Sequence, residues 1–248
     1  MIDFSQIATL YIDNNEVQEL YLNGSKVWQK ATGGGGGVKF TANQSNSTIK
    51  LQASSSAPSV DLVYSTDGST WNAYTVGDTI TLTNVGDYVF FKAGSNGNTR
   101  FSSASNNYHR FVMAGSIAAS GSIMYLLDED GDPNATMDSY CFAKLFNGCT
   151  SLTSAPKLPS MNLAADCYNG MFQGCTSLTA SPALPALTTY SGSYSTMFDG
   201  CSALTSAGEV SATTFAQYSC QYMFQNCTSL TTPPILNVVG DLGNNACR

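Results

Sequence analysis

Charged residues are scarce in this chain of 248 residues, and basic ones are the scarcest, with 10 Lys and Arg against 17 Asp and Glu and a single His. Nucleic acids are bound by clustered Lys and Arg, so a net charge of −7 argues against a nucleic-acid partner. No uninterrupted apolar run approaches the roughly 20 residues that a membrane helix needs, which argues against membrane insertion. Ser, Thr, Asn and Gly are plentiful instead and predict a polar but uncharged surface.

The residue sets of the common catalytic and metal sites are also missing. His109 is the only histidine, and no Cys, second His or motif-spaced carboxylate lies near it in the sequence, so we expect a surface strand residue. No C-x-x-C pair or dinucleotide fingerprint occurs, and no cofactor is expected. We predict that the protein is not an enzyme. A carbohydrate-active enzyme is the alternative, because a sequence does not show which carboxylates pair in space.

A repeat dominates the C-terminal half of the chain. Its motif is Met-Phe-x-Gly-Cys, with Leu for Met in the first copy and Asn for Gly in the fourth, and the four copies stand 26 residues apart. The shared aromatic and cysteine positions are Phe146, Cys149, Phe172, Cys175, Phe198, Cys201, Phe224 and Cys227. A strict period of this length predicts a solenoid whose units pack on their neighbours, with these shared residues in its interior.

Each repeat is expected to contain a short helix. Tyr168, Met171 and Phe172 lie at i, i+3 and i+4, the spacing of one helix face. The residue before each repeat cysteine is one that readily adopts a left-handed conformation, as a helix C′ cap does. These residues are Gly148, Gly174, Gly200 and Asn226. With a short strand at Ser177–Thr179, the pattern predicts an α/β solenoid attached to a mainly β protein.

All eight cysteines follow residue 140, yet their spacing does not predict a disulfide framework. Four share one repeat position and would form a ladder. A second position holds Cys141 and Cys167 in the first two copies but Ser193 and Ser219 in the later ones. A fold that depended on bridges would not replace the partners by Ser, so buried reduced thiols are favoured over bridges between neighbouring units.

The N-terminal segment combines a shorter repeat with a glycine run. Residues 10–17 and 20–28 each predict a strand, a tight turn and a strand. Such a hairpin module (residues 1–32) cannot bury a core alone, so it packs on the next domain or docks on another subunit. Gly33–Gly37 predicts a flexible linker at a domain boundary.

Residues 38–115 predict a small β-sandwich of immunoglobulin-like size. The expected strands are Val38–Ala42, Thr48–Ala53, Val60–Tyr64, Trp71–Tyr74, Thr79–Thr83, Tyr88–Lys92 and Tyr108–Met113. Residues 116–139 precede the repeats without matching their motif and are expected to cap the array, which spans residues 140–248 as four repeats and the start of a fifth.

An acidic run lies within this expected cap. Asp128, Asp130 and Asp132 could hold a cation through alternate carboxylates. A calcium loop of the EF-hand type, however, places its Gly at position six and a bidentate Glu at position twelve, and neither fits here. The run therefore favours a solvated turn over a weak cation site.

Two segments resemble known families. The motif Met-Phe-x-Gly-Cys-Thr-Ser-Leu-Thr, with Pro-x-Leu-Pro after it in the early copies, resembles the BspA-like leucine-rich repeats of surface proteins from gut bacteria and their phages. The Asn-Gly turn followed by Val27 and Trp28 resembles N-terminal pieces of bacteriophage tail and fibre proteins. The second resemblance implies attachment to other virion proteins through residues 1–32. Fibres of this kind are often trimeric, which implies a homo-oligomer.

The hypothesis that joins these observations is a bacteriophage virion protein whose repeat array binds a polysaccharide or protein on the host surface. Repeat proteins bind with the face on which their units differ, and Tyr offers contact area with little loss of entropy. Tyr190, Tyr218 and Tyr222 lie in the variable turns and are the candidate contact residues, unless they cover the seam between helices. The alternative is a bacterial cell-surface adhesin, which needs an export signal, and Met1–Gln6 do not resemble one.

Overall fold

Backbone pairing makes this fold mainly β. The computed structural model describes residues 19–22, 25–29, 36–234 and 236, with side chains from residue 36 onward. Strands β1 (Glu19–Leu22) and β2 (Ser25–Gln29) pair antiparallel, as the Asn-Gly turn between them predicts. The first copy of the ten-residue repeat lies outside the described residues.

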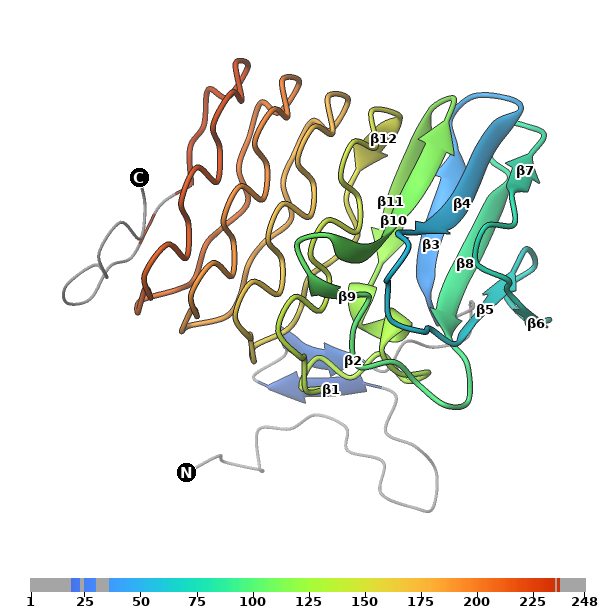
Figure 1. The fold of residues 1–248 in the computed structure, drawn as a ribbon, viewed down its shortest axis with the longest axis horizontal. Helices are drawn as coiled ribbons and strands as arrows, with labels where there is room; N and C mark the ends of the chain where they lie inside the picture. The colour runs from blue at the N-terminus through green and yellow to red at the C-terminus, as the bar shows by residue number, and fades with distance from the viewer. Residues whose placement is uncertain (1–18, 23–24, 30–35, 235, 237–248) are drawn as a thin grey trace.

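Two sheets follow the hairpin (Figure 1). The first has four strands in the order β7 (Ile80–Leu82), β4 (Ser47–Ala53), β10 (Asn107–Ala114), β9 (Ser102–Ala104). The second has six, in the order β12 (Leu152–Ser154), β11 (Ile117–Gly121), β3 (Val38–Ala42), β8 (Tyr88–Ala93), β5 (Leu62–Ser65), β6 (Asn72–Ala73). Alternation of apolar residues predicts most of these strands, but the short strand β9 has no such signal.

The two sheets pack face to face through aromatic rings. Phe40 on β3 and Phe91 on β8 point inward from the six-stranded sheet, and Phe111 on β10 points inward from the four-stranded sheet. The ring centroid of Phe111 lies 4.9 Å from that of Phe40 and 5.6 Å from that of Phe91. All three side chains are at most 1% exposed, so they form the centre of this core.

The glycine run is not a linker over its whole length. A Cβ on Gly36 would lie 2.8 Å from the ring of Tyr125, and one on Gly37 would lie 2.8 Å from the Phe91 carbonyl oxygen. These two glycines therefore allow close packing at the start of β3, which corrects the linker prediction for them. Gly33–Gly35 lie outside the described residues.

No α-helix occurs in the described ranges, and the helix expected around Tyr168–Phe172 is a succession of turns. Within the second unit the odd-numbered amides donate to the carbonyl three residues back, as Met171 does to Tyr168. The even-numbered amides donate to the next unit, as Phe172 does to Met197 at 2.9 Å. The i, i+3, i+4 pattern was misleading because a run of turns also places such residues on one side of the chain.

Every fourth residue of this turn segment has a positive φ. The positions are Tyr140, Lys144 and Gly148 in the first unit, Asp166, Gly170 and Gly174 in the second, Gly192, Thr196 and Gly200 in the third, and Tyr218, Tyr222 and Asn226 in the fourth. The left-handed conformation predicted for Gly148, Gly174, Gly200 and Asn226 is present, with φ from 59° to 76°. It closes a turn, however, and not the predicted helix.

The repeat array continues the six-stranded sheet. Strand β11 pairs antiparallel with β3 on one side and parallel with β12, from the first repeat, on the other. The later units are joined at the equivalent place by single parallel bridges such as Ala180 to Ser206 and Ser206 to Thr232. Residues 117–121, predicted to lie in a cap, are thus a sheet strand that offers its edge to the repeats (Figure 1).

Between β11 and the first repeat lies the one helical turn among the described residues, the 3-10 helix η2 (Ile123–Leu126). The Ser122 hydroxyl accepts from the Met124 amide at 3.2 Å and caps its start. Ile123, Met124 and Leu126 are buried, and the helical turn packs against β8 and β3.

Candidate functional site

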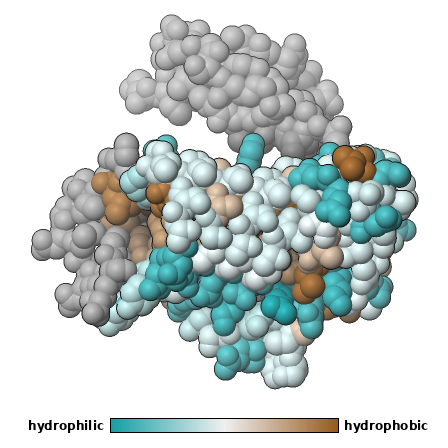
Figure 2. All heavy atoms as spheres, turned by 90° about the horizontal axis from the view of Figure 1, so that it is seen from above, coloured by the Kyte–Doolittle hydropathy of each residue, from teal (hydrophilic) through white to brown (hydrophobic). Residues whose placement is uncertain are grey.

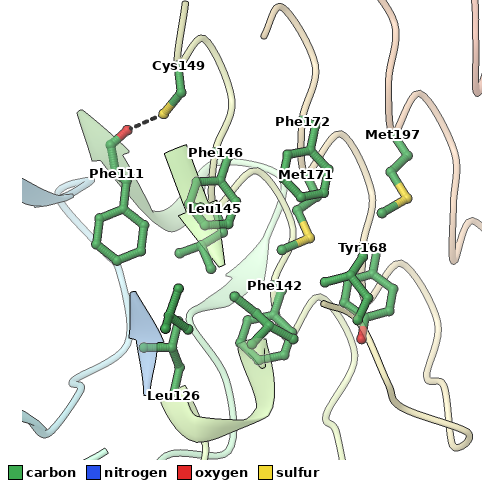
Figure 3. Packing of buried hydrophobic residues seen from close by; sticks show 14 of the residues in the cluster. Phe111, Leu126, Phe142, Leu145, Phe146, Cys149, Tyr168, Met171, Phe172 and Met197 are labelled. Atoms are coloured by element: carbon green, nitrogen blue, oxygen red, sulfur yellow. Dashed lines mark hydrogen bonds between the residues drawn. The ribbon is translucent and has the colours of Figure 1, made fainter. Parts of the chain in front are cut away.

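The shared residues of the repeats form two columns of stacked rings (Figure 3). The first column runs from Phe111 through Phe146, Phe172, Phe198 and Phe224, with neighbouring centroids 5.2 to 5.4 Å apart. The second column runs through Phe101, Phe142, Tyr168 and Tyr194. Both columns begin in the two-sheet part, so the sheets supply the first layer on which the repeats stack.

The cysteine column is bound to the same scaffold. Cys149 donates its thiol to the Phe111 carbonyl oxygen at 3.0 Å, as Figure 3 shows. Cys175, Cys201 and Cys227 donate in the same way to the phenylalanine carbonyls of the preceding units, each at 3.1 Å. Cys149, Cys175, Cys201 and Cys227 are free thiols. Their repetition follows from a thiol that both fills the interior and binds a carbonyl between units.

These thiols are poor nucleophiles. Burial raises the pKa of the Cys149, Cys167 and Cys201 thiols to about 12, and it raises the pKa of Cys175 well above the usual range. Reactive cysteines are instead partly exposed and have a lowered pKa, because the thiolate is the attacking species. The arrangement therefore assigns these four cysteines to folding rather than to chemistry.

The three candidate contact tyrosines lie on the surface of the last two units. Tyr190 is 51% exposed, Tyr218 37% and Tyr222 38%. Tyr218 and Tyr222 occupy two of the positive-φ positions of the fourth unit, and Tyr190 lies in the preceding unit, where its amide donates to the Ser193 hydroxyl at 2.8 Å. No ring contact joins the three tyrosines. The described repeats contain no helix, so the helix seam, the alternative site for these tyrosines, is not present.

Tyr222 also lines a groove in the fourth repeat. The groove has a volume of about 380 Å³. Its lining consists of Cys220, Tyr222, Met223, Phe224, Gln225, Pro234 and Leu236. None of these residues is a carboxylate, so this groove does not provide the acid pair that glycoside hydrolysis requires.

The acidic run forms a turn that is held by its own carboxylates. The Asp128 carboxylate accepts from the amides of Asp130 and Asp132 at 3.0 and 3.2 Å, and Asp132 accepts from the Asn134 amide at 2.8 Å. Over the described part of the chain, no three His, Cys, Asp or Glu side chains are placed to hold a metal ion together. The carboxylates are therefore engaged within their own turn.

His109 is buried rather than exposed, which corrects the sequence prediction. Its side chain is 2% exposed, and Nδ1 lies 3.0 Å from the Phe101 carbonyl oxygen. Burial lowers the pKa of the imidazole below its usual value, although the bond to Phe101 partly opposes this. The misjudgement arose because β9 and the preceding Phe101 cover a strand that looked like a sheet edge.

A polar ladder on the outside of the turns escaped the sequence analysis. The Asn147 amide donates to Gln173 at 3.1 Å, Gln173 donates to Asp199 at 2.9 Å, and Asn226 donates to Asp199 at 2.9 Å. The variable residue of the repeat motif supplies three of these side chains, and a polar residue recurring there was the available signal. The ladder joins neighbouring units through side-chain amides and the Asp199 carboxylate, which accepts two of the three bonds.

The described face of the molecule drawn in Figure 2 is mostly polar. Figure 2 shows described surface atoms that are mostly pale or teal, with hydrophobic atoms in small separate clusters. In the described ranges, no helix has the length and apolar character needed to span a lipid bilayer.

Comparison of the chain with protein-family models, curated proteins and solved structures finds no match.

Proposed function

We propose that the chain is a non-enzymatic structural protein of a bacteriophage virion, of the tail or capsid fibre type. In this proposal, residues 1–32 attach to other virion proteins and the repeat array faces the host. The order of parts supports it: a hairpin module, then two packed sheets, then an array built directly onto the edge of one sheet. A homo-oligomer, as in trimeric fibres, is part of the proposal.

The proposal includes a finer description of the fold. The array is a solenoid of the leucine-rich-repeat type, and the two-sheet part is an immunoglobulin-like sandwich. Hydrogen bonds that recur at a spacing of 25 residues between units, together with parallel ring stacks, support the solenoid. The helices of the predicted α/β solenoid are absent from the described repeats and are not part of this proposal.

The observation that carries the binding role is the exposure of Tyr190, Tyr218 and Tyr222 on a scaffold of stacked rings. Each of these tyrosines is more than a third exposed, so part of its surface is open to a ligand. Held by a rigid array, such rings bind with little loss of entropy. The polar, weakly charged surface around them suits a polysaccharide or protein receptor on a host cell.

The location of the protein is tested by immunoelectron microscopy of purified virions with an antibody to this chain. Label on tails or capsids is the expected result. Label that appears solely on bacterial envelopes would favour the alternative, a BspA-like cell-surface adhesin, which the resemblance of the repeat motif also supports.

The binding face is tested by the double variant Tyr190→Ala with Tyr218→Ala. We expect attachment to host cells to weaken by about tenfold or more, because two exposed aromatic contacts are removed. The melting temperature stays unchanged because neither ring is buried. Leu187→Ala is the matched control, since Leu187 is 54% exposed in the same turn as Tyr190. Undiminished attachment, or a large loss of stability, would remove these tyrosines from the binding face.

A further inference from the structure

The outer face of the six-stranded sheet carries a cluster that we term the aromatic–lysine face, made of Lys39, Trp71, Tyr88, Phe90 and Lys92. Tyr88, Phe90 and Lys92 alternate along β8 with the residues that enter the core. Lys39 is opposite Phe90 in the register of β3 with β8, two strands that run side by side in Figure 1. Trp71 precedes β6, and its ring centroid lies 6.5 Å from that of Phe90.

Both lysines of this face lie over rings. Lys39 Nζ is 4.2 Å from the centroid of Tyr88 and 5.5 Å from that of Phe90, and Lys92 Nζ is 4.6 Å from that of Trp71. Within the described residues neither ammonium has a carboxylate partner, in contrast to Arg100, which pairs with Asp138 at 3.6 Å. The positive charge of this face is therefore held in place but not neutralised.

Two acidic groups lie near this face in the sequence, and both are engaged by their own turns. Asp87, next to Tyr88, accepts from the Asn84 amide at 2.8 Å. Asp67, four residues before Trp71, accepts hydrogen bonds from the amides of Ser69 and Thr70 at 2.8 and 2.7 Å. These amide bonds lower the pKa of its carboxyl, which is ionised but engaged by its own turn. In the part of the chain that the structure describes, neither lysine of this face is paired with a carboxylate, although the chain carries a net charge of −7.

The spacing of the two lysines suits one extended ligand. Lys39 pairs with Phe90, so Lys92 is its diagonal neighbour across the two strands, with Cα atoms about 7 to 8 Å apart. A charge-assisted hydrogen bond is stronger than the attraction between a cation and an exposed ring. An incoming carboxylate can therefore draw each ammonium off its ring and uncover the ring for contact.

We propose that the aromatic–lysine face binds an acidic polysaccharide that carries carboxylates on alternate sugars. The carboxylates pair with Lys39 and Lys92, and the flat C–H face of the neutral sugar between them packs on Trp71 and Tyr88. A single-stranded nucleic acid would also stack on these rings. It brings a phosphate with every nucleotide, however, and this acidic chain lacks the basic groove that tracks such a backbone.

The test uses the full chain and a hyaluronan decasaccharide at low ionic strength, with binding followed by calorimetry and by tryptophan fluorescence. We expect binding that weakens with added salt. Lys39→Gln with Lys92→Gln should weaken binding by about tenfold or more, and Trp71→Ala should do the same. Lys50→Gln is the matched control because Lys50 lies on β4, in the other sheet, and it should leave the affinity unchanged.

A second arm uses the unaltered protein and so does not depend on the folding of any variant. The methyl ester of the same decasaccharide keeps the sugar rings but loses the charges, and it should bind about tenfold more weakly or worse. No binding of the acid form, equal binding of the ester, an equal effect of Lys50→Gln, or tighter binding of oligothymidine would each overturn the proposal. The result is independent of virion location and of the repeat tyrosines, so either proposal can fail alone.

Discussion

At the scale of single residues, one hydroxyl group in the core has no partner. The Tyr168 hydroxyl is the sole side-chain polar atom in the described structure that is both buried and without a hydrogen bond. Its ring lies between those of Phe142 and Tyr194 in the second ring column. Burial of a polar group without a bond opposes folding, and the equivalent position in the first unit is already Phe.

Tyr168→Phe should therefore raise the free energy of unfolding by about 1 kcal/mol, as measured by urea denaturation. The ring stack is kept and only the unpaired oxygen is removed. Phe142→Tyr is the reciprocal variant and should lower stability, because it adds a hydroxyl to the same buried column. A destabilised Tyr168→Phe protein would show that the hydroxyl does have a partner.

The buried His109 gives a pH dependence whose direction follows from its pKa. The folded state holds the imidazole neutral and lowers its pKa, whereas the unfolded chain binds a proton near pH 6.5. Above about pH 6.5 both states are neutral and the group has no effect. As the pH falls below 6.5, the unfolded state gains protons first, so the free energy of unfolding decreases progressively.

The measurement is urea denaturation at pH 7.5 and pH 5.5, compared with His109→Asn, which cannot titrate in this range. The native protein should lose more stability between the two pH values than the variant does. Equal losses would mean that His109 titrates alike in the folded and unfolded states.

At the scale of elements, the ring columns should make inner repeats more sensitive than the last one. Phe172 contacts rings on both sides, at 5.2 and 5.4 Å, whereas Phe224 has a described ring neighbour on one side alone and is only partly buried. Phe172→Ala should cost about 3 to 5 kcal/mol, and Phe224→Ala about half as much. Thermal denaturation of the two variants checks the order, and equal losses would contradict a core built from stacked rings.

The elements also show how far sequence patterns predict this structure. Strands such as β3, β4 and β8 follow from period-two alternation, and the 26-residue motif correctly places Phe146 and Cys149 inside. The turn segments were not predictable, because Tyr140 and Lys144 adopt positive φ without the usual Gly or Asn. Inter-unit hydrogen bonds hold these residues there, and such long-range constraints leave no local signal.

The candidate binding surfaces were also only partly predictable from the sequence. Tyr190 and Tyr218, which lie in turns that vary between the repeats, are exposed, as residues outside a shared interior can be. The aromatic–lysine face was missed, because it depends on the register between β3 and β8 and on where Trp71 lies after its turn. Which residues pair across two strands depends on the whole fold, so the sequence of a single strand does not predict it.

At the scale of the whole molecule, the sheets and the repeats share one interior. The amides of Phe101 and Phe111 donate to carbonyls of the first repeat at 2.6 and 2.8 Å, and those of Ile117 and Ile123 do so at 2.9 and 3.0 Å. The first repeat thus stacks on the two-sheet part as each later repeat stacks on its predecessor. Repeat arrays gain stability from such neighbour contacts, so we infer that the sheets nucleate the array.

We therefore predict a single cooperative unfolding transition for the sheets and the array together. All eight cysteines belong to the array, so thiol labelling in urea reports on the repeats alone. Trp71 fluorescence, measured in a Trp28→Phe background, reports on the sheets. The two curves should coincide in the otherwise native chain, because coincident probes mark a two-state transition. Separate midpoints would mean that the array and the sheets fold independently.

Phe146→Ala should separate the unfolding of the repeats from that of the sheets. The Phe146 ring lies 5.3 Å from Phe111, 6.1 Å from Phe40 and 5.2 Å from Phe172, so it joins both sheets to the second repeat. Removal of the ring should lower the free energy of unfolding by about 3 to 5 kcal/mol, mainly by weakening the contact between the sheets and the repeats. Thiols should then become reactive at lower urea than the Trp71 signal changes. Curves that stay superimposed would show that β11, rather than the ring column, couples the two parts.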